Sequence, residues 1–342
     1  MAVTQNDIAR LAGVSQRTVS RCFIEPDIVT QSVRERVLRL AEEAGYRPNL
    51  AARSIRRGRF DSVVLIDDSA CRRSWAHPLL LASVNERLTQ ERYHLSLAHL
   101  PAGACSSGVG LPTVFGHLMA DGLLVNFHPE FPERIERDIG GLPLPTIWIN
   151  TARAADCVYP NDRSAGRQAA EKLIGLGHQR IAYLDSPHRP QGAKGRYRNC
   201  RERHSGYREA LLAANLAPRV LAPAAGMVTS ELVAFCRRVM TEPDRPTAVV
   251  ACRLEDAQTL AYAACAGAGL RLPGDLSIVT FADEPVKNAP FLAAHATPWK
   301  EMGDLAVRML LEKIGNPDTS IPPLLLPIPL HPGETLAAPA RR

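Results

Sequence analysis

The chain has 342 residues, of which 46% are hydrophobic and 22% charged, with a formal net charge of +6. This length exceeds one simple core and predicts a small domain followed by a larger, two-lobed body. No apolar run reaches the ~18 residues of a membrane span, and polar residues interrupt the start, so neither a span nor a signal peptide is expected. We therefore expect a cytoplasmic protein.

Recognisable catalytic and metal-binding motifs are missing from the sequence. The eight cysteines are scattered without a CxxC pair, which predicts reduced thiols and no structural zinc site. There is no G-x-G-x-x-G after a strand, no P-loop, no nucleophile elbow and no H-E-x-x-H. We predict no cofactor, no metal and no catalytic residues, although an enzyme on a nucleotide-binding type of lobe is one alternative class.

Near its start, the sequence has the pattern of two short helices joined by a tight turn. Thr4 and Ser15 are suitable N-caps, and Gly13 lies where the chain must leave the first helix. Ala9 is small where the helices would cross, and Val19 falls on the buried side of the second helix. This is the helix-turn-helix arrangement, whose second helix enters the DNA major groove. An unrelated αα-hairpin would have the same spacing.

The exposed side of the second helix favours the DNA-binding interpretation. It carries side chains of the kinds that bond base edges and phosphates, namely Gln16, Arg17, Ser20 and Arg21. Residues 1–60 contain eleven Arg and no Lys against six acidic residues, a net charge of +5, whereas the rest of the chain has +1. Such local positive charge is typical of a module that meets a polyanion. The alternative is an ordinary solvated helical surface.

A third helix should complete this first domain. It is predicted to begin after Thr30, to end at Gly45 and to bury Val33, Val37 and Ala41 against the hairpin. The domain then spans residues 1–46. Residues 47–60 follow as a linker with a short helix, which should be unstable in water without a partner.

The remaining residues, 61–342, alternate between short apolar runs and helical patterns. Strands are predicted at 62–66, 94–97, 122–125, 146–149, 179–184, 248–251 and 276–280. Helices are predicted around 79–90, 165–176 and 204–215, and a further helix follows the strand at 248–251 and ends at Gly267. Alternation of this kind predicts an α/β fold with two parallel-sheet lobes. Ligands bind such sheets at the carboxyl ends of the strands, here in a cleft between the lobes.

Several motifs of the first sixty residues resemble the LacI family of bacterial transcription regulators. They are Asp7-Ile8-Ala9, Ala12-Gly13-Val14-Ser15, Thr18-Val19-Ser20-Arg21, Arg34-Glu35-Arg36-Val37, Gly45-Tyr46-Arg47-Pro48-Asn49 and Ala51-Ala52-Arg53-Ser54. The resemblance implies a homodimer that binds double-stranded operator DNA, with a hinge helix and a bilobed body like that of periplasmic binding proteins. It places lobe 1 at about 61–160 and 292–325, and lobe 2 at about 161–291 and 326–336. The proline-rich C-terminus has no heptad repeat, so no coiled-coil tetramer is expected.

The resemblance also implies roles in DNA binding. Gln16, Arg17 and Arg21 match base-reading positions, and Thr18 and Ser20 match positions that hold the helix on phosphates or within its own turn. In the hinge, the matching residues are Asn49, Ala52 and Ile55. Ile55 would enter the minor groove and unstack a base step, a physically reasonable way to bend DNA. Alternatively, Ile55 is a core residue of a short linker helix.

For the cleft, Arg203 matches the family's ligand-anchoring arginine, and an Arg fork suits vicinal hydroxyls or a carboxylate. A merely solvated Arg203 is the alternative. The other expected effector-binding residues are Trp75, Asn161, Asp162, Arg253 and Asp283. The sequence departs from the family here, with a single carboxylate in Phe281-Ala282-Asp283 and the arginines Arg72 and Arg73 in the first lobe. These departures favour an acidic or unusual ligand over a neutral hexose.

The predicted effector is accordingly a sugar or sugar acid whose binding modulates the DNA affinity of a repressor. Besides the enzyme on a nucleotide-binding type of lobe, two alternatives remain. One is a regulator without a small-molecule inducer. The other is a soluble solute-binding protein, which residues 1–60 disfavour.

Overall fold

The computed structural model describes residues 3–47, 58–67, 76–99, 119–126, 133–186, 198–224, 226–284 and 291–340. The chain divides into two compact units, Met1–Phe60 and Asp61–Arg342. Each unit has hydrophobic core residues of its own. Among the described helices, none combines the length and the apolar character needed to cross a membrane.

The described residues of the first unit form three helices and a single turn of 3-10 helix: α1 (Gln5–Ala12), α2 (Gln16–Ile24), η1 (Pro26–Ile28) and α3 (Gln31–Glu43). Local caps set the hairpin. The Asp7 carboxylate accepts from the Thr4 N–H at 3.0 Å, and the Asp7 N–H donates to the Thr4 hydroxyl. Gly13 takes the left-handed conformation at φ 62°, and the Ser15 hydroxyl accepts from the Thr18 N–H at 3.0 Å. The predicted helix-turn-helix is thus confirmed.

Apolar residues of all three helices meet in one small core. Ile8, Val19 and Val37 are fully buried there, with Ala9 and Ala41 beside them. Val33 packs at the edge of this core, and the Thr30 position precedes α3 as predicted, although its side chain makes no capping hydrogen bond. Because the inward face of α2 is committed to the core, its outward face is left for a partner.

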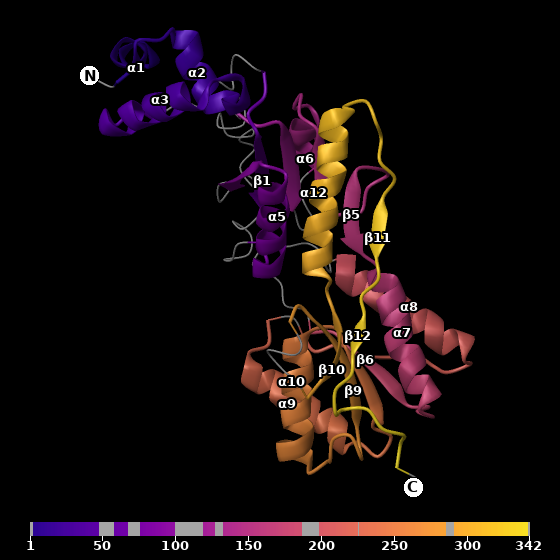
Figure 1. Cartoon of the computed structure of the whole chain (residues 1–342). Helices are drawn as coiled ribbons and strands as arrows, with labels where there is room; N and C mark the ends of the chain where they lie inside the picture. Colours follow the sequence, from indigo (N-terminus) through magenta and orange to yellow (C-terminus); the bar gives the residue numbers. More distant parts are fainter. Residues whose placement is uncertain are drawn as a thin grey trace. The chain divides into compact units, whose positions relative to one another are not determined.

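The first sheet of the larger unit is wholly parallel, in the order β11-β5-β4-β3-β1-β2. Its strands are β1 (Ser62–Asp67), β2 (His94–His99), β3 (Gly122–Asn126), β4 (Thr146–Ile149), β5 (Cys157–Pro160) and β11 (Leu324–Leu326). Helices α5 (Pro78–Gln90) and α12 (Trp299–Gly315) pack side by side on one face (Figure 1), and α6 (Glu133–Gly140) covers the other.

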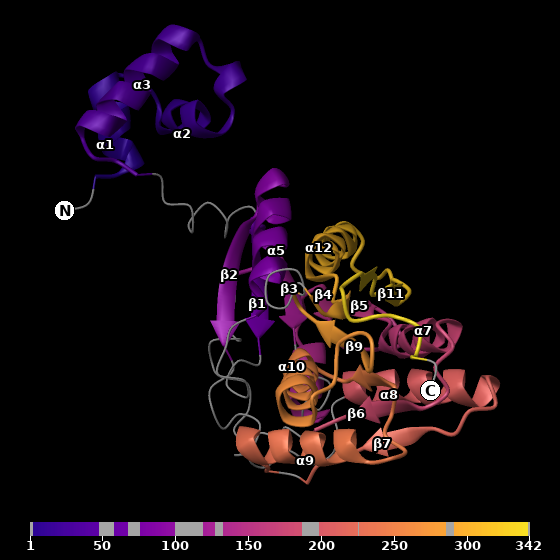
Figure 2. The ribbon, with the colours of Figure 1, turned by 90° about the horizontal axis from the view of Figure 1, so that it is seen from below.

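The second sheet has the order β12-β10-β9-β8-β6-β7. Its strands are β6 (Ile181–Leu184), β7 (Arg219–Leu221), β8 (Ala248–Ala251), β9 (Ser277–Ala282), β10 (Ala293–Ala296) and β12 (Leu330–His331). Helices α7 (Asp162–Gly175) and α8 (Arg198–Ala213) pack on one face. Helices α9 (Thr229–Thr241) and α10 (Leu254–Tyr262), with the π-helical turn η4 (Ala263–Gly267), pack on the other (Figure 2). The prediction of an α/β fold with two parallel-sheet lobes is confirmed.

Two details of the second sheet differ from the sequence-based expectations. Strand β10, which the expected range 292–325 assigns to the first lobe, pairs in parallel with β9 in the second sheet. Its four residues have no helical or alternating pattern, so only their pairing shows which sheet they join. Strand β12 is antiparallel to β10. Helices α6, α9 and α12 were not among the predicted elements.

Helices α7 and α8 approach unusually closely where two glycines face the opposite backbone. A Cβ added at Gly166 would lie 2.0 Å from the carbonyl oxygen of Arg203, and one at Gly206 would lie 1.9 Å from that of Arg163. Real Cβ atoms do not tolerate such distances, so any larger residue must separate the helices. This contact fixes the first turn of α7 beside the middle of α8.

The C-terminal segment runs along the second sheet and covers a buried imidazole. The Nε2 of His178 lies 2.9 Å from the carbonyl oxygen of Ala337, and its Nδ1 lies 3.0 Å from the Thr247 hydroxyl. A carbonyl oxygen only accepts, so Nε2 carries the proton and donates. Burial lowers the pKa of His178 and also that of the buried His295.

Acidification should therefore destabilise the larger unit. The unfolded chain binds these protons more readily than the folded one, so the free energy of unfolding is highest above the unfolded pKa of about 6.5 and falls as the pH decreases below it. Urea unfolding of the full chain at pH 7.5 and 5.5 should give a lower midpoint at pH 5.5. His178→Gln should reduce this dependence, whereas His94→Gln, at an exposed position, should leave it unchanged. Equal midpoints for the wild-type protein would contradict the prediction.

Candidate functional sites

The outward face of α2 presents most of the residues predicted to contact DNA. The side chains of Gln16 and Arg17 are exposed, and those of Ser20 and Arg21 are half-buried. Arg21 lies 3.9 Å from the Glu25 carboxylate, a loose and largely exposed ion pair. Such a pair contributes little to stability, so the Arg21 guanidinium can exchange it for a nucleic-acid partner.

Other predicted residues of this unit have local partners. Thr18 shares a hydrogen bond of 2.8 Å with the Ser15 hydroxyl, which places it within its own helical turn. The amide of Gln16 lies 3.4 Å from that of Gln5. Asn49, Ala52 and Ile55 of the predicted hinge lie outside the described residues.

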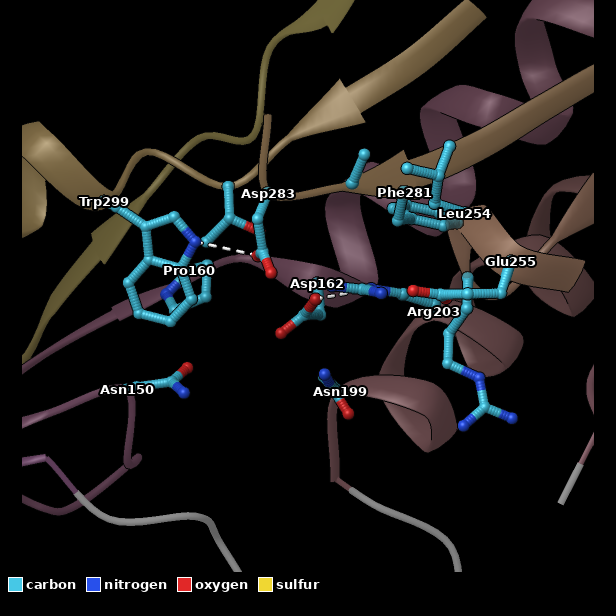
Figure 3. A pocket seen from close by; sticks show the side chains of 13 residues that line it. Asn150, Pro160, Asp162, Asn199, Arg203, Leu254, Glu255, Phe281, Asp283 and Trp299 are labelled. Atoms are coloured by element: carbon cyan, nitrogen blue, oxygen red, sulfur yellow. Dashed lines mark hydrogen bonds and ion pairs between the residues drawn. The ribbon is translucent and has the colours of Figure 1, made fainter. Parts of the chain in front are cut away.

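The larger unit has a cavity of about 270 Å³ where its two sheets meet. It is lined by residues that follow or end strands of both sheets and by residues from the starts of four helices: Asn150, Pro160, Asp162, Asn199, Arg203, Arg253, Leu254, Glu255, Phe281, Ala282, Asp283, Thr297 and Trp299. The carboxyl ends of parallel strands are the expected position for a ligand site. Figure 3 shows these side chains around the open space.

A buried ion pair forms one wall of the cavity. The Arg203 Nε donates to the Asp162 carboxylate at 2.7 Å (Figure 3). Its Nη1 donates to the carbonyl oxygen of Cys252 at 3.1 Å. The guanidinium also lies 4.4 Å from the centre of the Phe281 ring. Burial acts to lower the pKa of Arg203, but the Asp162 carboxylate and nearby thiols raise it above its ordinary value, so Arg203 stays charged. Arg203 is therefore a fixed cation, not a solvated surface side chain.

A second set of contacts joins the two lobes at the cavity edge. The indole Nε1 of Trp299 donates to the Asp283 carboxylate at 2.8 Å. The Trp299 ring stacks on His77 with centroids 5.2 Å apart, and the His77 Nε2 lies 3.6 Å from the Glu284 carboxylate. Because Trp299 follows the passage of the chain from β10 into α12, a shift between the lobes would disturb these contacts.

The remaining predicted effector residues differ in their surroundings. Arg253 lines the cavity, but its guanidinium donates to Ser186 and lies 3.6 Å from the buried Asp256 carboxylate. Asn161 is not among the lining residues, because its side chain caps α7 by accepting from the Ser164 N–H at 3.1 Å. Trp75, with Arg72 and Arg73, lies outside the described residues.

Five polar lining residues were not predicted from the sequence: Asn150, Asn199, Glu255, Thr297 and Trp299. Asn150 directly follows β4, and its position at a strand end was a usable signal. Asn199 and Trp299 come from helix starts, where only the fold brings them to the cavity.

Comparisons with known proteins agree with this architecture. The family described as bacterial regulatory proteins, lacI family, matches residues 4–49, and a periplasmic binding protein-like domain matches residues 170–336. The chain is 30% identical over 329 residues to the ribose operon repressor of Haemophilus influenzae, which covers 94% of this chain and 95% of that protein.

Two solved structures are similar over nearly their whole length. The lac repressor dimer bound to operator and an anti-inducer has a TM-score of 0.78 at 22% identity, covering 99% of this chain and 100% of that one. The complex of the transcriptional regulator CelR with cellobiose has a TM-score of 0.62 at 25% identity, covering 97% and 99%. The first similarity bears on the fold alone.

Proposed function

The chain belongs to the LacI family of bacterial regulatory proteins, and from this premise we propose that it acts as a homodimeric repressor of transcription. Its two copies of α2 address half-sites of a near-palindromic operator, because a two-fold dimer matches a two-fold DNA site. The observation that supports this most directly concerns α2. One face of this helix packs in the core of the first unit, and the opposite face presents hydrogen-bond donors to solvent. We propose that the cavity binds a ligand and carries out no catalytic step.

The experiment that tests the proposal is selection of genomic DNA by the purified full chain. Retained fragments are sequenced at moderate salt, with and without candidate metabolites. A shared near-palindromic sequence among the retained fragments is expected. If no fragment is enriched over bulk competitor under any of these conditions, the proposal is wrong.

Substitution of Arg21 by alanine should remove operator preference. A bidentate contact between Arg and guanine contributes about 1 to 3 kcal/mol of discrimination, so specificity should fall about 5- to 150-fold while weak, salt-sensitive binding remains. Competition gel shifts with operator and scrambled duplexes measure this ratio. Arg39→Ala is the matched control, because Arg39 lies on α3 and pairs with Glu43 at the surface. Full selectivity in the Arg21 variant would refute the assignment.

For the cavity, we propose a neutral sugar or polyol of about monosaccharide size. The described lining has three carboxylates, from Asp162, Glu255 and Asp283, against two guanidinium groups. Arg203 and Arg253 are each already paired with a carboxylate. An added acid would therefore meet no unmatched cation in this lining, whereas hydroxyl groups can bond to amides, carboxylates and the remaining guanidinium N–H groups. The volume of about 270 Å³ lies at the small end of ligand pockets.

The sugar-related names of two similar proteins, the ribose operon repressor and the CelR–cellobiose complex, support a ligand of this class. Calorimetry that compares neutral pentoses and hexoses with the corresponding uronic acids distinguishes a neutral ligand from an acidic one. Saturable binding of a neutral sugar is expected. Binding of acids alone would favour the acidic ligand expected from the sequence, with a role for Arg72 or Arg73.

A regulator without an inducer is the second candidate. It is favoured by one observation, namely that Asp162 and the carbonyl oxygen of Cys252 already hold the Arg203 guanidinium. In that case, no metabolite should change the retained DNA. A ligand changes DNA affinity only through its different affinity for the two states of the protein, so the direction of any change identifies inducer or co-repressor.

A further inference from the structure

Two cysteines and an aspartate gather behind the Arg203 wall of the cavity. The carboxylate of Asp185 and the sulfur atoms of Cys200 and Cys252 all lie within 4.8 Å of one another. Each residue is at most 5% exposed. None of the expected DNA or effector roles uses them.

The fold brings these residues together from three separate elements. Asp185 directly follows β6 and Cys252 directly follows β8, and these adjacent parallel strands pair Leu184 with Ala251. The Cys252 N–H donates to the Leu184 carbonyl oxygen at 2.8 Å, which holds the two strand ends in register.

The third residue approaches from the helix layer. Alternate strand residues share a face, so Cys252 lies on the same face as Val250, which packs with α7 and α8. Cys200, in the first turn of α8, belongs to the same cluster, and its carbonyl oxygen accepts from the Tyr183 hydroxyl at 3.4 Å. Since the three residues are far apart in sequence, their spacing resembles no metal motif.

We propose that Asp185, Cys200 and Cys252 form a binding site for a thiophilic divalent cation of the Zn²⁺ type. Thiolate sulfur and carboxylate oxygen are both zinc ligands, and three protein ligands leave a fourth tetrahedral position for water or another donor. Cys200 directly follows the lining residue Asn199, and the lining residue Arg203, one helical turn further along α8, donates to the carbonyl oxygen of Cys252, so the site borders the cavity that would admit the ion.

The charges around the cluster are compatible with such an ion. The two neighbouring cations have carboxylate partners of their own, Arg203 with Asp162 and Arg253 with Asp256. Binding replaces the two thiol protons by one divalent ion, forms two metal–sulfur bonds and releases two protons to solvent. The net charge of the buried region is therefore unchanged, which avoids the penalty of burying an uncompensated charge.

Titration of the reduced, chelator-treated full chain with Cd²⁺ tests the site, with the ultraviolet charge-transfer absorption of cadmium–thiolate bonds as the signal. We expect saturation at one ion per chain and displacement by Zn²⁺. Cys200→Ser and Cys252→Ser should each lose this saturable step, and Asp185→Asn should weaken it at least tenfold. Cys236→Ser is the matched control, because Cys236 is equally buried but packs in the core on the opposite face of the sheet.

Two results of the titration would overturn the proposal. One is the absence of a saturable thiolate signal in the folded wild-type chain. The other is an unchanged step in both cysteine variants. If circular dichroism shows that the serine variants do not fold, the test uses Asp185→Asn instead. The rise in Tm that Zn²⁺ causes in the wild-type chain must then be smaller in Asp185→Asn. Mass spectrometry that finds a Cys200–Cys252 disulfide, with no cation bound after reduction, would also refute a metal site.

Discussion

Replacing Gly206 with alanine is expected to destabilise the second lobe by about 3 kcal/mol or more. The added Cβ would lie 1.9 Å from the Arg163 carbonyl oxygen and 2.7 Å from the Arg167 nitrogen, and both are backbone atoms of α7. Neither can move by a rotamer change, so the helices must separate. Separation also pulls Arg203, on α8, away from Asp162, at the start of α7. Thermal unfolding of the full chain measures the loss.

Gly175→Ala is the matched control for this prediction. Gly175 ends α7, and an added Cβ there would meet nothing within 4 Å. Alanine restricts the unfolded chain and favours a helix by roughly 0.5 to 1 kcal/mol, so this variant should be unchanged or slightly stabilised. A Gly206→Ala protein as stable as Gly175→Ala would show that the close approach of α7 and α8 is absent in solution.

Replacing Arg203 with methionine should abolish ligand binding and destabilise the lobe by about 3 to 5 kcal/mol. The substitution leaves the Asp162 carboxylate, whose side chain is 3% exposed, without its cation, and removing one partner of a buried pair has this effect. Adding Asp162→Leu to the variant should recover much of the stability but none of the binding. Denaturant unfolding and calorimetry with the neutral sugar identified for the wild type separate the two effects.

The surface pair of Arg163 and Glu209 joins the same two helices and provides the control. The Arg163 side chain is 59% exposed, so Arg163→Met should change stability by less than about 1 kcal/mol. If Arg203→Met changed the free energy of unfolding as little as Arg163→Met, the buried pair would contribute no more to stability than a surface pair. If the Arg203 variant still bound the sugar, Arg203 would not be an effector-binding residue.

Features of the first unit were predictable because their causes are local. Thr4 and Asp7 are only three residues apart and together cap the start of α1. Gly13 supplies the left-handed turn at the end of this helix. In residues 61–342, the alternation of short apolar runs with helical patterns likewise predicted the parallel sheets. Strand β10 was misassigned because its pairing partner, not its own sequence, decides which sheet it joins.

The cavity could be predicted only in part. Arg203 and Asp162 were expected effector residues, but that they bind each other follows only once α7 and α8 pack through Gly166 and Gly206. Asn161 has the residue type of a ligand contact, yet a nearby backbone N–H uses its side chain as a cap. The cluster at Asp185 left no trace in the sequence, since its members meet only across neighbouring strands and a helix.

The late position of α12 in the chain has a consequence for the order in which the protein can mature on the ribosome. This helix supplies Met302, Ala306 and Leu310 to the core of the first sheet, yet it is synthesised after most of the second lobe. Helix α5 covers part of this sheet face early, but the part that α12 covers must stay exposed in the nascent first lobe while some 140 residues between β5 and α12 emerge. The contiguous N-terminal unit meets no such delay, so its fold can be complete before the body that controls it exists.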